Sequence, residues 1–310
     1  MTSPQSSRLQ DRFGRLVNSL RISLTQRCNF NCFFCHKEGE SNPLGEMTVK
    51  EIEAIVEASS NLGIRKVKLT GGEPLIRDDV VEIVKSIAPY VEEVSMTTNG
   101  SLLKERAKKL KKAGLKRVNI SLHSTRRDVF WKITGQDLAK EVMEGIKAAI
   151  DNRLIPVKLN MVAIRKINSE EIPEMIEFSK RIGAILQLIE FQPIQEGAKE
   201  YSRLHYDLHA VEEDLAKKSI KIYERDLNRR RRFLLERGGE VEVVRPMHNS
   251  EFCRYCSRLR VTSDGRLKPC LMRDDNLIEA VSLIRSGASK EDLENAIREA
   301  VSNREPYWRS

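Results

Sequence analysis

Six cysteines are the side chains of this sequence whose spacing points most clearly to chemistry. They fall into two sets of three, which are Cys28, Cys32 and Cys35, and Cys253, Cys256 and Cys270. Thiolates bind zinc ions and iron–sulfur clusters. A structural zinc site takes four protein ligands, whereas a four-iron, four-sulfur cluster held by three thiolates keeps one iron free for a small molecule. The tight C-x3-C-x2-C spacing of the first set therefore favours a cluster with an open iron.

Three other interpretations of the first set are weaker. The segment Cys32–His36 matches C-x-x-C-H, the attachment pattern of c-type haem, but that attachment takes place outside the cytoplasm and the sequence shows no export signal. His36 offers a fourth ligand for a zinc site. Inert core cysteines are disfavoured because the loop is polar, with Arg27, Asn29, Asn31 and Lys37.

The second set has the wider spacing C-x2-C-x13-C and leaves two interpretations open. With His248 nearby it fits a Cys3His zinc knuckle. Beside a first cluster site, a second iron–sulfur cluster is favoured.

Charge and composition limit the kinds of partner. The chain has 310 residues, with 54 basic and 45 acidic side chains and a net charge of +9, which suits an anionic partner. Aromatic residues make up only 5%, which weighs against a stacking platform for nucleic acid, so we expect a phosphorylated metabolite and no nucleic acid. No segment approaches the ~18 apolar residues of a membrane span, and no secretory signal is found, so we expect no membrane and a cytoplasmic location.

The elements that must position the cysteines alternate between strands and helices. Predicted strands are Leu20–Leu24, Lys66–Thr70, Glu93–Thr97, Arg117–Leu122, Val157–Ile164 and Ile185–Phe191. Amphipathic helices are predicted near 50–62, 78–88, 103–113, 138–152 and 170–182. A capping box at Thr48–Glu51 and the glycines Gly63 and Gly114 support their ends. Repeated βαβ units imply a parallel sheet, either a partial barrel or an open doubly wound sheet, with ligands at the carboxyl ends of its strands.

The pattern changes after about residue 195. Residues 199–237 are highly charged, and we expect helix there, with Arg229–Arg232 on an exposed helix face. A short strand at Val241–Val244 and a helical tract near 276–302 follow. We place a soft boundary at 195–230 and predict one domain at 1–225 and a second at 226–310.

Three motifs carry a resemblance to a known family. Cys28–Cys35, read as Cys-Asn-Phe-Asn-Cys-Phe-Phe-Cys, resembles the signature loop of the radical S-adenosylmethionine (SAM) enzymes, and Gly71–Pro74 and Thr97–Gly100 agree with it. The second cysteine set, followed by Ser257–Arg260 and Ser263–Gly265, is similar to the GTP 3′,8-cyclases of molybdenum cofactor biosynthesis. The resemblance extends from Leu9 to Leu271.

The resemblance implies an α/β fold, an incomplete (β/α)6 TIM-like barrel with a C-terminal extension that bears an iron–sulfur cluster. It implies two [4Fe-4S] clusters as cofactors, one on each cysteine set, and SAM at the open iron of the first. The 5′-deoxyadenosyl radical then abstracts H3′ of GTP, the second cluster holds guanine, and the product is (8S)-3′,8-cyclo-7,8-dihydroguanosine 5′-triphosphate. The downstream enzyme is cyclic pyranopterin monophosphate synthase, the electron donor stays unidentified, and a homodimer is one assembly that we consider.

The resemblance also assigns binding residues. The implied SAM contacts are Phe34, Gly72, Glu73, Ser121 and Gln192. Glycine lets backbone approach a ligand, and Glu73 can accept from the ammonium group of SAM. The implied GTP contacts are Arg21, Lys68, Thr97, Lys158, Arg258 and Arg260. Arg258 and Arg260 alternate on an extended stretch, so both face one side, and guanidinium groups match phosphate oxygens in pairs.

The sequence also departs from the family pattern. Lys68 replaces an expected arginine, Gln192 a common methionine, and Ser121–Ser124 reads Ser-Leu-His-Ser rather than Ser-Leu-Asp-Ala. The tail Glu305–Ser310 lacks a terminal Gly-Gly. Two other functions stay open: a radical SAM enzyme that modifies peptides with the help of an auxiliary cluster, and a basic nucleic-acid-binding protein stabilised by metal.

Overall fold

A computed structural model describes residues 9–40 and 44–308 of the chain. Its centre is one twelve-stranded sheet in the order β12-β11-β10-β1-β2-β3-β4-β5-β6-β9-β8-β7. The strands are β1 (Ser19–Ser23), β2 (Lys66–Thr70), β3 (Glu93–Thr98), β4 (Leu115–Ser121), β5 (Lys158–Ala163), β6 (Ile185–Glu190), β7 (Ser219–Glu224), β8 (Arg231–Leu235), β9 (Glu240–Val244), β10 (Arg258–Val261), β11 (Arg266–Lys268) and β12 (Ile278–Glu279). The two ends of this order do not pair with each other, so the sheet is open.

The six strands β1 to β6 pair in parallel and in chain order. Each of the six predicted strands is present, and no bound differs from the prediction by more than two residues. The chain after residue 225 extends this parallel part at both edges, because β10 pairs in parallel with β1 and β9 pairs in parallel with β6. The remaining pairs, among β10, β11 and β12 and among β9, β8 and β7, are antiparallel.

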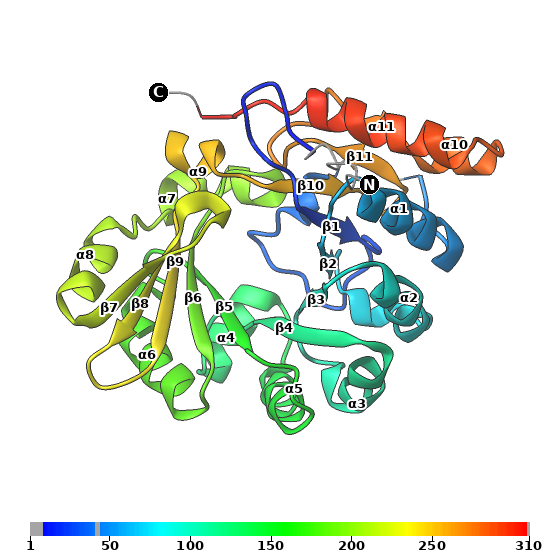
Figure 1. Ribbon diagram of the computed structural model, residues 1–310. Coiled ribbons are helices and arrows are strands. Elements are labelled where there is room, and N and C mark those ends of the chain that lie inside the picture. Colours follow the sequence, from blue (N-terminus) through cyan, green and yellow to red (C-terminus); the bar gives the residue numbers. More distant parts are fainter. Residues whose placement is uncertain (1–8, 41–43, 309–310) are drawn as a thin grey trace.

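Helices cover the outer side of this sheet, which curves as an arc in Figure 1. The α-helices of the described residues are α1 (Val49–Asn61), α2 (Val80–Ile87), α3 (Leu103–Ala113), α4 (Arg127–Thr134), α5 (Ala139–Asp151), α6 (Ile172–Arg181), α7 (Tyr201–Leu204), α8 (His209–Lys217), α9 (Ser250–Arg254), α10 (Val281–Arg285) and α11 (Lys290–Ser302). Strand residues that face the helices are apolar and buried, such as Leu20, Ile22 and Leu69, while Arg21 and Lys68 lie on the other face. A curved sheet with one helix-covered face confirms the incomplete TIM-like barrel and excludes the doubly wound alternative.

The helix ends that the sequence predicts are formed by the expected residues. Thr48 accepts from the Glu51 amide while the Glu51 carboxylate accepts from the Thr48 amide at 2.7 Å, which completes the capping box of α1. Gly114 ends α3 at a φ of 113°, a conformation that favours glycine. These caps fix where each helix returns toward the sheet and hence where the loops at the carboxyl ends begin.

The prediction of helix over residues 199–237 is wrong for its second half. The α-helices there are α7 and α8, and β7 and β8 form an antiparallel hairpin on the edge of the sheet, joined through a short 3-10 turn at Leu227–Arg229. Arg229–Arg232 therefore does not lie on an exposed helix face, since Arg231 and Arg232 begin β8. The hairpin is explained by Glu242 on the neighbouring strand, whose fully buried carboxylate needs cations beside it.

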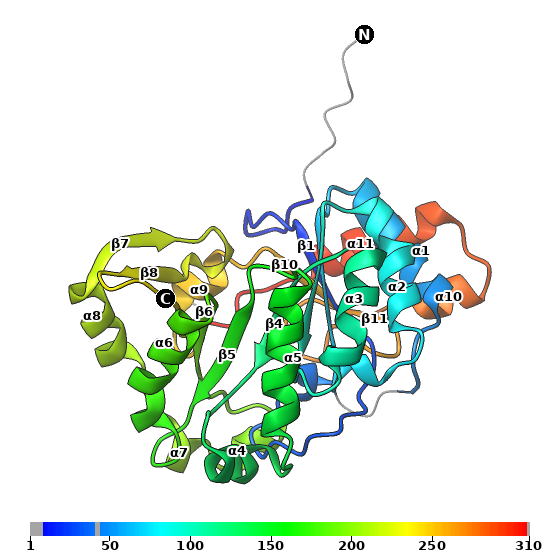
Figure 2. The ribbon, with the colours of Figure 1, turned by 90° about the horizontal axis from the view of Figure 1, so that it is seen from below.

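The C-terminal segment packs along the first helix. Figure 2 shows α10 and α11 beside α1, and ion pairs join Arg285 to Glu51 at 2.7 Å and Lys290 to Glu57 at 2.9 Å. The predicted strand near Val241–Val244 is β9, and the predicted tract at 276–302 contains α10 and α11 with a break at Gly287 (φ 76°). Across the described ranges, no helix is long and apolar enough to cross a bilayer.

Candidate active site

The first cysteine set lies in the loop that follows β1. The thiol groups are free, with Cys28 exposed and Cys32 and Cys35 half-buried. Burial raises the pKa of Cys28 to about 11, and the charges of Cys35 and Cys28 add to burial in raising that of Cys32, so the three sulfurs are close enough to interact. A cation bound to these sulfurs relieves both effects, because it favours the thiolate form.

One ring nitrogen of His36 is already engaged within the loop. Its Nδ1 accepts a hydrogen bond from the Glu38 amide at 3.0 Å, and burial lowers its pKa. Over residues 9–40 and 44–308, no three histidine, cysteine or acidic side chains surround a single metal-ion position. Three soft thiols on one loop, with the neighbouring imidazole nitrogen engaged elsewhere, are a donor set that fits an iron–sulfur cluster with one open iron.

Polar side chains from other loops hold the first cysteine loop in place. Asn29 donates to the Ser101 hydroxyl at 3.0 Å and accepts from the Asn99 amide group at 2.8 Å. The Asn31 amide donates to the Thr134 carbonyl at 2.8 Å. Asn99 and Ser101 follow β3, so the predicted Thr97–Gly100 motif contacts the cysteine loop, as expected for loops at the carboxyl ends of neighbouring parallel strands.

The Gly71–Pro74 turn packs directly on the residues before Cys28. A β-carbon on Gly71 would collide with the Thr25 carbonyl, and one on Gly72 with the Arg27 carbonyl. The amides of Gly72 and Glu73 donate to the same two carbonyls at 2.6 and 2.9 Å. Glycine is therefore required here by contact between two loops, while its predicted contact with SAM stays a prediction.

Glu73 is fully buried, and its carboxylate accepts from three donors. These are the Thr98 hydroxyl at 2.6 Å, the Asn99 amide at 2.6 Å and the Leu75 amide at 2.9 Å. Burial raises the pKa of Glu73 to about 7, although these hydrogen bonds oppose the rise. Glu73 thus ties its own turn to the loop after β3. Its predicted role as acceptor for the SAM ammonium group stays a prediction.

The other predicted SAM contacts lie at the carboxyl ends of neighbouring strands. Ser121 ends β4, and Gln192 follows β6 by two residues. The ring of Phe34 packs edge-on against His123, with centroids 4.9 Å apart, and against Phe191 at 6.2 Å. His123 is one of the departures from the family pattern, and the structure makes it part of the wall behind Phe34.

A row of cations crosses the inner face of the sheet. The strand register places Arg260, Arg21, Lys68, Ser95 and Arg117 side by side on β10, β1, β2, β3 and β4. Lys68 donates to Asn119 at 3.0 Å, and Asn119 in turn donates to Asn160 and Gln187, at 3.3 Å each.

The pKa of Lys68 shows how many cations converge on this face. Burial places it well below its usual range, and the charges of Arg117, Arg21, Lys158 and Arg258 lower it further. Of the other predicted GTP contacts, Arg21, Lys158 and Arg258 therefore lie close enough to interact with Lys68, and Arg260 belongs to its row. Thr97 lies half-buried on the adjoining β3. An anion bound among these side chains would relieve their mutual repulsion.

Glu38 is a partner of this row that the sequence did not reveal. Its carboxylate pairs with Arg21, accepts from Arg260 at 2.8 Å and accepts from the Thr70 hydroxyl at 3.0 Å. Glu38 follows Cys35 by three residues, so this one side chain joins the first cysteine loop to the cations. A single acidic residue among many gives no signal in the sequence.

Arg258 is different from its neighbours because its guanidinium forms no ion pair or hydrogen bond within the described part of the chain. Burial and the charges of Arg260 and Arg21 lower its pKa to about 9. A half-buried cation beside other cations is costly unless an anion joins it. This side chain therefore marks where an anionic ligand is expected.

The second cysteine set approaches the same row. Cys253 lies on α9, Cys256 precedes β10, and Cys270 follows β11. The pKa of Cys253 is raised by burial and also by the charges of Cys270 and Cys256, so these sulfurs lie near one another. Although burial raises the pKa of Cys256, the charges of Arg304, Arg258 and Arg260 bring it down to about 7. A thiol that is readily ionised is suited to bind iron.

Both ends of the described chain fasten this second set. Asp11 accepts from Arg15 at 2.7 Å and from the buried Arg304 at 2.8 Å. Arg15 donates to the Cys253 carbonyl at 3.0 Å, and Arg304 donates to the Cys256 carbonyl. The two arginines thus hold the backbone beside two of the three cysteines, and sequence reasoning did not find them.

The tail adds a further contact. The Trp308 amide donates to the Cys253 sulfur at 3.4 Å, and the Trp308 ring stacks on His248 with centroids 4.2 Å apart. His248, which offered a fourth zinc ligand, is therefore packed against the tail. The last two residues of the tail lie outside the described residues.

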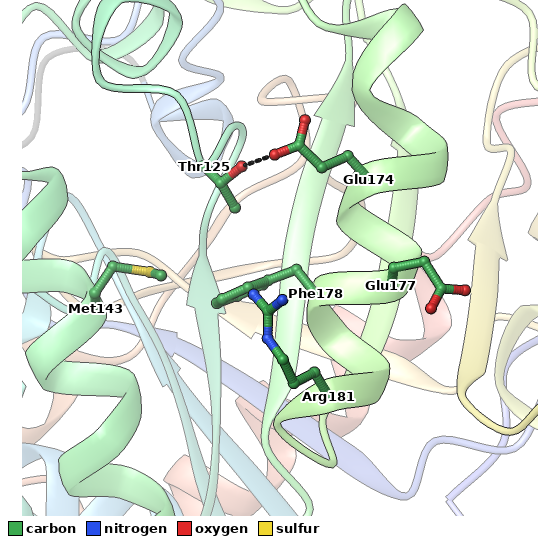
Figure 3. Close-up of a pocket in the computed structure, with 6 residues that line it drawn as sticks. All are labelled: Thr125, Met143, Glu174, Glu177, Phe178 and Arg181. Atoms are coloured by element: carbon green, nitrogen blue, oxygen red, sulfur yellow. Dashed lines mark hydrogen bonds between the residues drawn. The ribbon is translucent and has the colours of Figure 1, made fainter.

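A surface pocket of the outer layer is separate from this site. Figure 3 shows it between α5 and α6, lined by Thr125, Met143, Glu174, Glu177, Phe178 and Arg181. Thr125 donates to Glu174 at 2.8 Å across its upper edge. It contains no cysteine and none of the row cations, so it is not the candidate active site.

Two family models together match nearly the whole chain. The model described as radical SAM superfamily matches residues 22–179, and the one described as Molybdenum Cofactor Synthesis C matches residues 184–310. The first begins within β1 and contains the first cysteine set and strands β2 to β5, and the second contains the second set.

Full-length relatives carry one name. A "Probable GTP 3′,8-cyclase" of Thermococcus kodakarensis is 52% identical over 97% of this chain and 100% of its own length. Proteins with the same name from Pyrococcus abyssi and Methanocaldococcus jannaschii are 50% and 45% identical, each over 97% of this chain and 99% of its own length.

Solved structures agree on the fold. Streptococcus suis SuiB bound to the precursor peptide SuiA superposes with a TM-score of 0.65 at 17% identity, covering 93% of this chain and 68% of that one. SuiB bound to S-adenosylmethionine gives a TM-score of 0.62 at 17% identity, over 93% and 69%. On these matches and on the geometry above, the chain belongs to the radical SAM superfamily and, within it, to the family of GTP 3′,8-cyclases.

Proposed function

We propose that this chain converts GTP to (8S)-3′,8-cyclo-7,8-dihydroguanosine 5′-triphosphate, the first step of molybdenum cofactor biosynthesis. The observation that carries the proposal is the row of half-buried cations between the two cysteine sets, with Arg258 in no ion pair within the described residues. A triphosphate would add negative charge beside Arg258, whereas the arginines of the row and Lys158 already have acidic partners. The name shared by full-length relatives supports the same reaction.

The first cysteine set would hold a [4Fe-4S] cluster with SAM at its open iron. When bound, this pair supplies the 5′-deoxyadenosyl radical that removes H3′ of GTP. The chain's own part is to orient SAM and exclude water, since a carbon radical reacts with almost any hydrogen nearby. We assign Phe34, Gly72, Glu73, Ser121 and Gln192 to SAM, because they lie in the cysteine loop and at or just after the carboxyl ends of β2, β4 and β6.

The second cysteine set would hold a second [4Fe-4S] cluster whose open iron binds the guanine. Three thiols, one of them ionisable near neutral pH, and the packing of His248 against Trp308 support this assignment. The triphosphate would then lie on Arg258, Arg260, Arg21, Lys68 and Lys158, with Thr97 beside it. Guanidinium groups offer paired hydrogen bonds to phosphate oxygens, which hold the ribose in one position for hydrogen removal.

The remaining assignments follow the same function. We assign residues 1–225 to the barrel and 226–310 to the segment that closes the site. We assign a cytoplasmic location, where the six free thiols suit metal binding. The downstream enzyme is then cyclic pyranopterin monophosphate synthase, and a homodimer is the assembly to test first. Nucleic acid is not proposed as a partner, because the clustered cations face inward rather than forming an exposed stripe.

Anaerobic incubation with GTP, SAM and a strong reductant tests the proposal. GTP deuterated at C3′ should transfer deuterium to 5′-deoxyadenosine, and mass spectrometry should detect a cyclised nucleotide. Reconstituted protein should contain about eight irons per chain, four for each cluster. Formation of 5′-deoxyadenosine without deuterium and without a nucleotide product would leave a radical SAM enzyme that acts on another substrate, such as a peptide.

A further inference from the structure

Arg230 lies in the run of arginines whose helix prediction is wrong, and the turn before it is firmly fixed. Asn228 and Arg229 adopt positive φ angles of 62° and 49°, and the chain then becomes extended at Arg230. The Asn228 side chain donates to the Phe252 carbonyl at 2.6 Å, and its amide donates to the Tyr255 carbonyl at 2.8 Å. The turn is thus docked on the segment that carries Cys253 and Cys256.

The side chain of Arg230 points inward. It is only 11% exposed, and its Nη1 lies 3.0 Å from Glu242 Oε1. Its Nε donates to the Leu227 carbonyl at 3.3 Å, while its Nη2 donates to no atom of the described residues. Arg230 is therefore held in a defined orientation with one amino group available for a ligand.

The charges around Glu242 do not balance. This one buried carboxylate pairs with Lys158, with Arg225 at 3.0 Å, with Arg230 and with Arg232 at 3.8 Å. Arg232 lies closer to Glu240, at 3.0 Å, so Lys158, Arg225 and Arg230 are the three cations whose ion pairs within the described residues go to Glu242 alone. The excess positive charge lies beside Lys158, which the function already assigns to GTP.

Arg230 also belongs to the same group as the row cations. Its charge lowers the pKa of Arg258, and the charges of Arg225 and Arg117 lower its own, although burial is the largest cause in both cases. Arg230 therefore lies within interaction range of Arg258, two residues before Arg260 on β10, and of Arg117 at the β4 end of the row.

We infer that Arg230, held against Glu242, is a further phosphate-binding residue of the GTP site, delivered by the β7–β8 hairpin rather than by the barrel. The inference rests on the proposed function. The ligand class is a polyphosphate, because a planar guanidinium with a free amino group matches phosphate oxygens, and because several cations share one acid. The hairpin then adds Arg230 to the predicted phosphate-binding cations that β10, β1, β2 and β5 contribute.

Binding of GTP, GDP and guanosine to the anaerobically reconstituted protein tests the inference. Arg230→Ala should weaken GTP binding about 10- to 100-fold, the loss of a hydrogen bond between charged groups, and should leave guanosine binding unchanged. Arg231→Ala is the matched control, since this neighbour is 42% exposed and faces Glu212. The control should bind GTP within about twofold of the unmodified chain.

Steady-state kinetics separate a binding role from a structural one. Arg230→Ala should raise KM for GTP more than it lowers kcat, and Arg230→Lys should recover part of the loss by restoring the charge. If Arg230→Ala does not fold, Arg230→Lys decides: weaker GTP binding with unchanged guanosine binding supports the inference, and unchanged GTP binding overturns it.

The failure of this inference differs from the failure of the proposed function. If Arg258→Ala loses GTP binding and Arg230→Ala does not, the inference is wrong and the proposed function stands. If the unmodified protein neither binds nor cyclises GTP, the proposed function is wrong, and the inference falls with it.

Discussion

The two cysteine sets differ in their electrostatic surroundings. The first lies in a loop held by neutral amides and hydroxyls, and burial raises the pKa of all three of its thiols. The second lies beside three arginines, and the pKa of Cys256 falls to about 7. A neutral, partly exposed loop suits a cationic ligand such as SAM, whereas a cationic one suits a nucleoside triphosphate. The surroundings thus distinguish two sites whose ligand sets are alike.

Replacing one cysteine of either set should have the largest effect and should separate the roles of the two sets. Cys28→Ser should abolish formation of 5′-deoxyadenosine, because SAM has no iron to bind. Cys256→Ser should retain some 5′-deoxyadenosine formation but lose the cyclised product by at least about 1,000-fold, since GTP loses its orientation. Both products are measured by mass spectrometry after one anaerobic incubation. Equal loss of both in the two variants would contradict separate roles.

Removing the shared acid of the second region should cost the most stability. Asp11→Ala leaves the buried Arg15 and Arg304 uncompensated and should lower the free energy of unfolding by about 3–5 kcal/mol. We expect iron to be lost from the second set first, which halves the iron content. The exposed neighbouring pair of Arg12 and Glu305 provides the control, since Arg12→Ala should cost less than about 1 kcal/mol. Equal losses of stability in the Asp11→Ala and Arg12→Ala variants would contradict an anchoring role for Asp11.

Removing Arg258, which forms no ion pair among the residues that the structure describes, should affect binding rather than folding. Arg258→Ala should weaken GTP binding by about 1.5–3 kcal/mol while SAM binding stays unchanged. Because the substitution also relieves repulsion from Arg260 and Arg21, the melting temperature should not fall. Isothermal titration gives the affinity, and Arg298→Ala on the exposed face of α11 is the control. Weaker SAM binding by this variant would contradict the assignment of Arg258 to the GTP site beside the second cysteine set.

The first region should show its own pH dependence through His123. Burial lowers the pKa of His123 to about 4, so the folded protein binds fewer protons than the unfolded chain between about pH 4 and 6.5. Stability should therefore fall as the pH falls through this window, by roughly 2 kcal/mol from pH 7 to pH 5.

Urea unfolding at both pH values measures the effect. His123→Gln should reduce the difference, because glutamine keeps an acceptor for the Val162 amide but does not titrate. His209→Gln, at an exposed position, should leave it unchanged. The same loss of stability in both variants would assign the pH dependence to other groups.

The fold could be predicted from the sequence where one face of each element is apolar. The six parallel strands and their helices follow from periodic Leu, Ile and Val, and the caps follow from Thr48 and Gly114. The hairpin at 219–235 could not be predicted, because its many charged residues are typical of a solvent-exposed helix. Its inward arginines are explained only by Glu242, which comes from the next strand.

The site was predictable where residues carry a spaced motif and not where they act through distant partners. The spacing of the cysteines indicates cluster ligands, and the alternation of Arg258 and Arg260 on an extended stretch indicates phosphate binding. Glu38 has no pattern, and its role depends on Arg260, 222 residues further along the chain. Asp11 and Arg304 are 293 residues apart, and they meet because both ends of the described chain pack beside the second cysteine set.

Spectroscopy on a chain that keeps only the second set tests the central claim most directly. A variant with alanine at positions 28, 32 and 35 should still bind about four irons. Electron paramagnetic resonance of the reduced variant should show a cluster signal that GTP changes and SAM does not. A signal that responds to SAM rather than GTP, or no cluster signal at all, would contradict the division of ligands between the two sets.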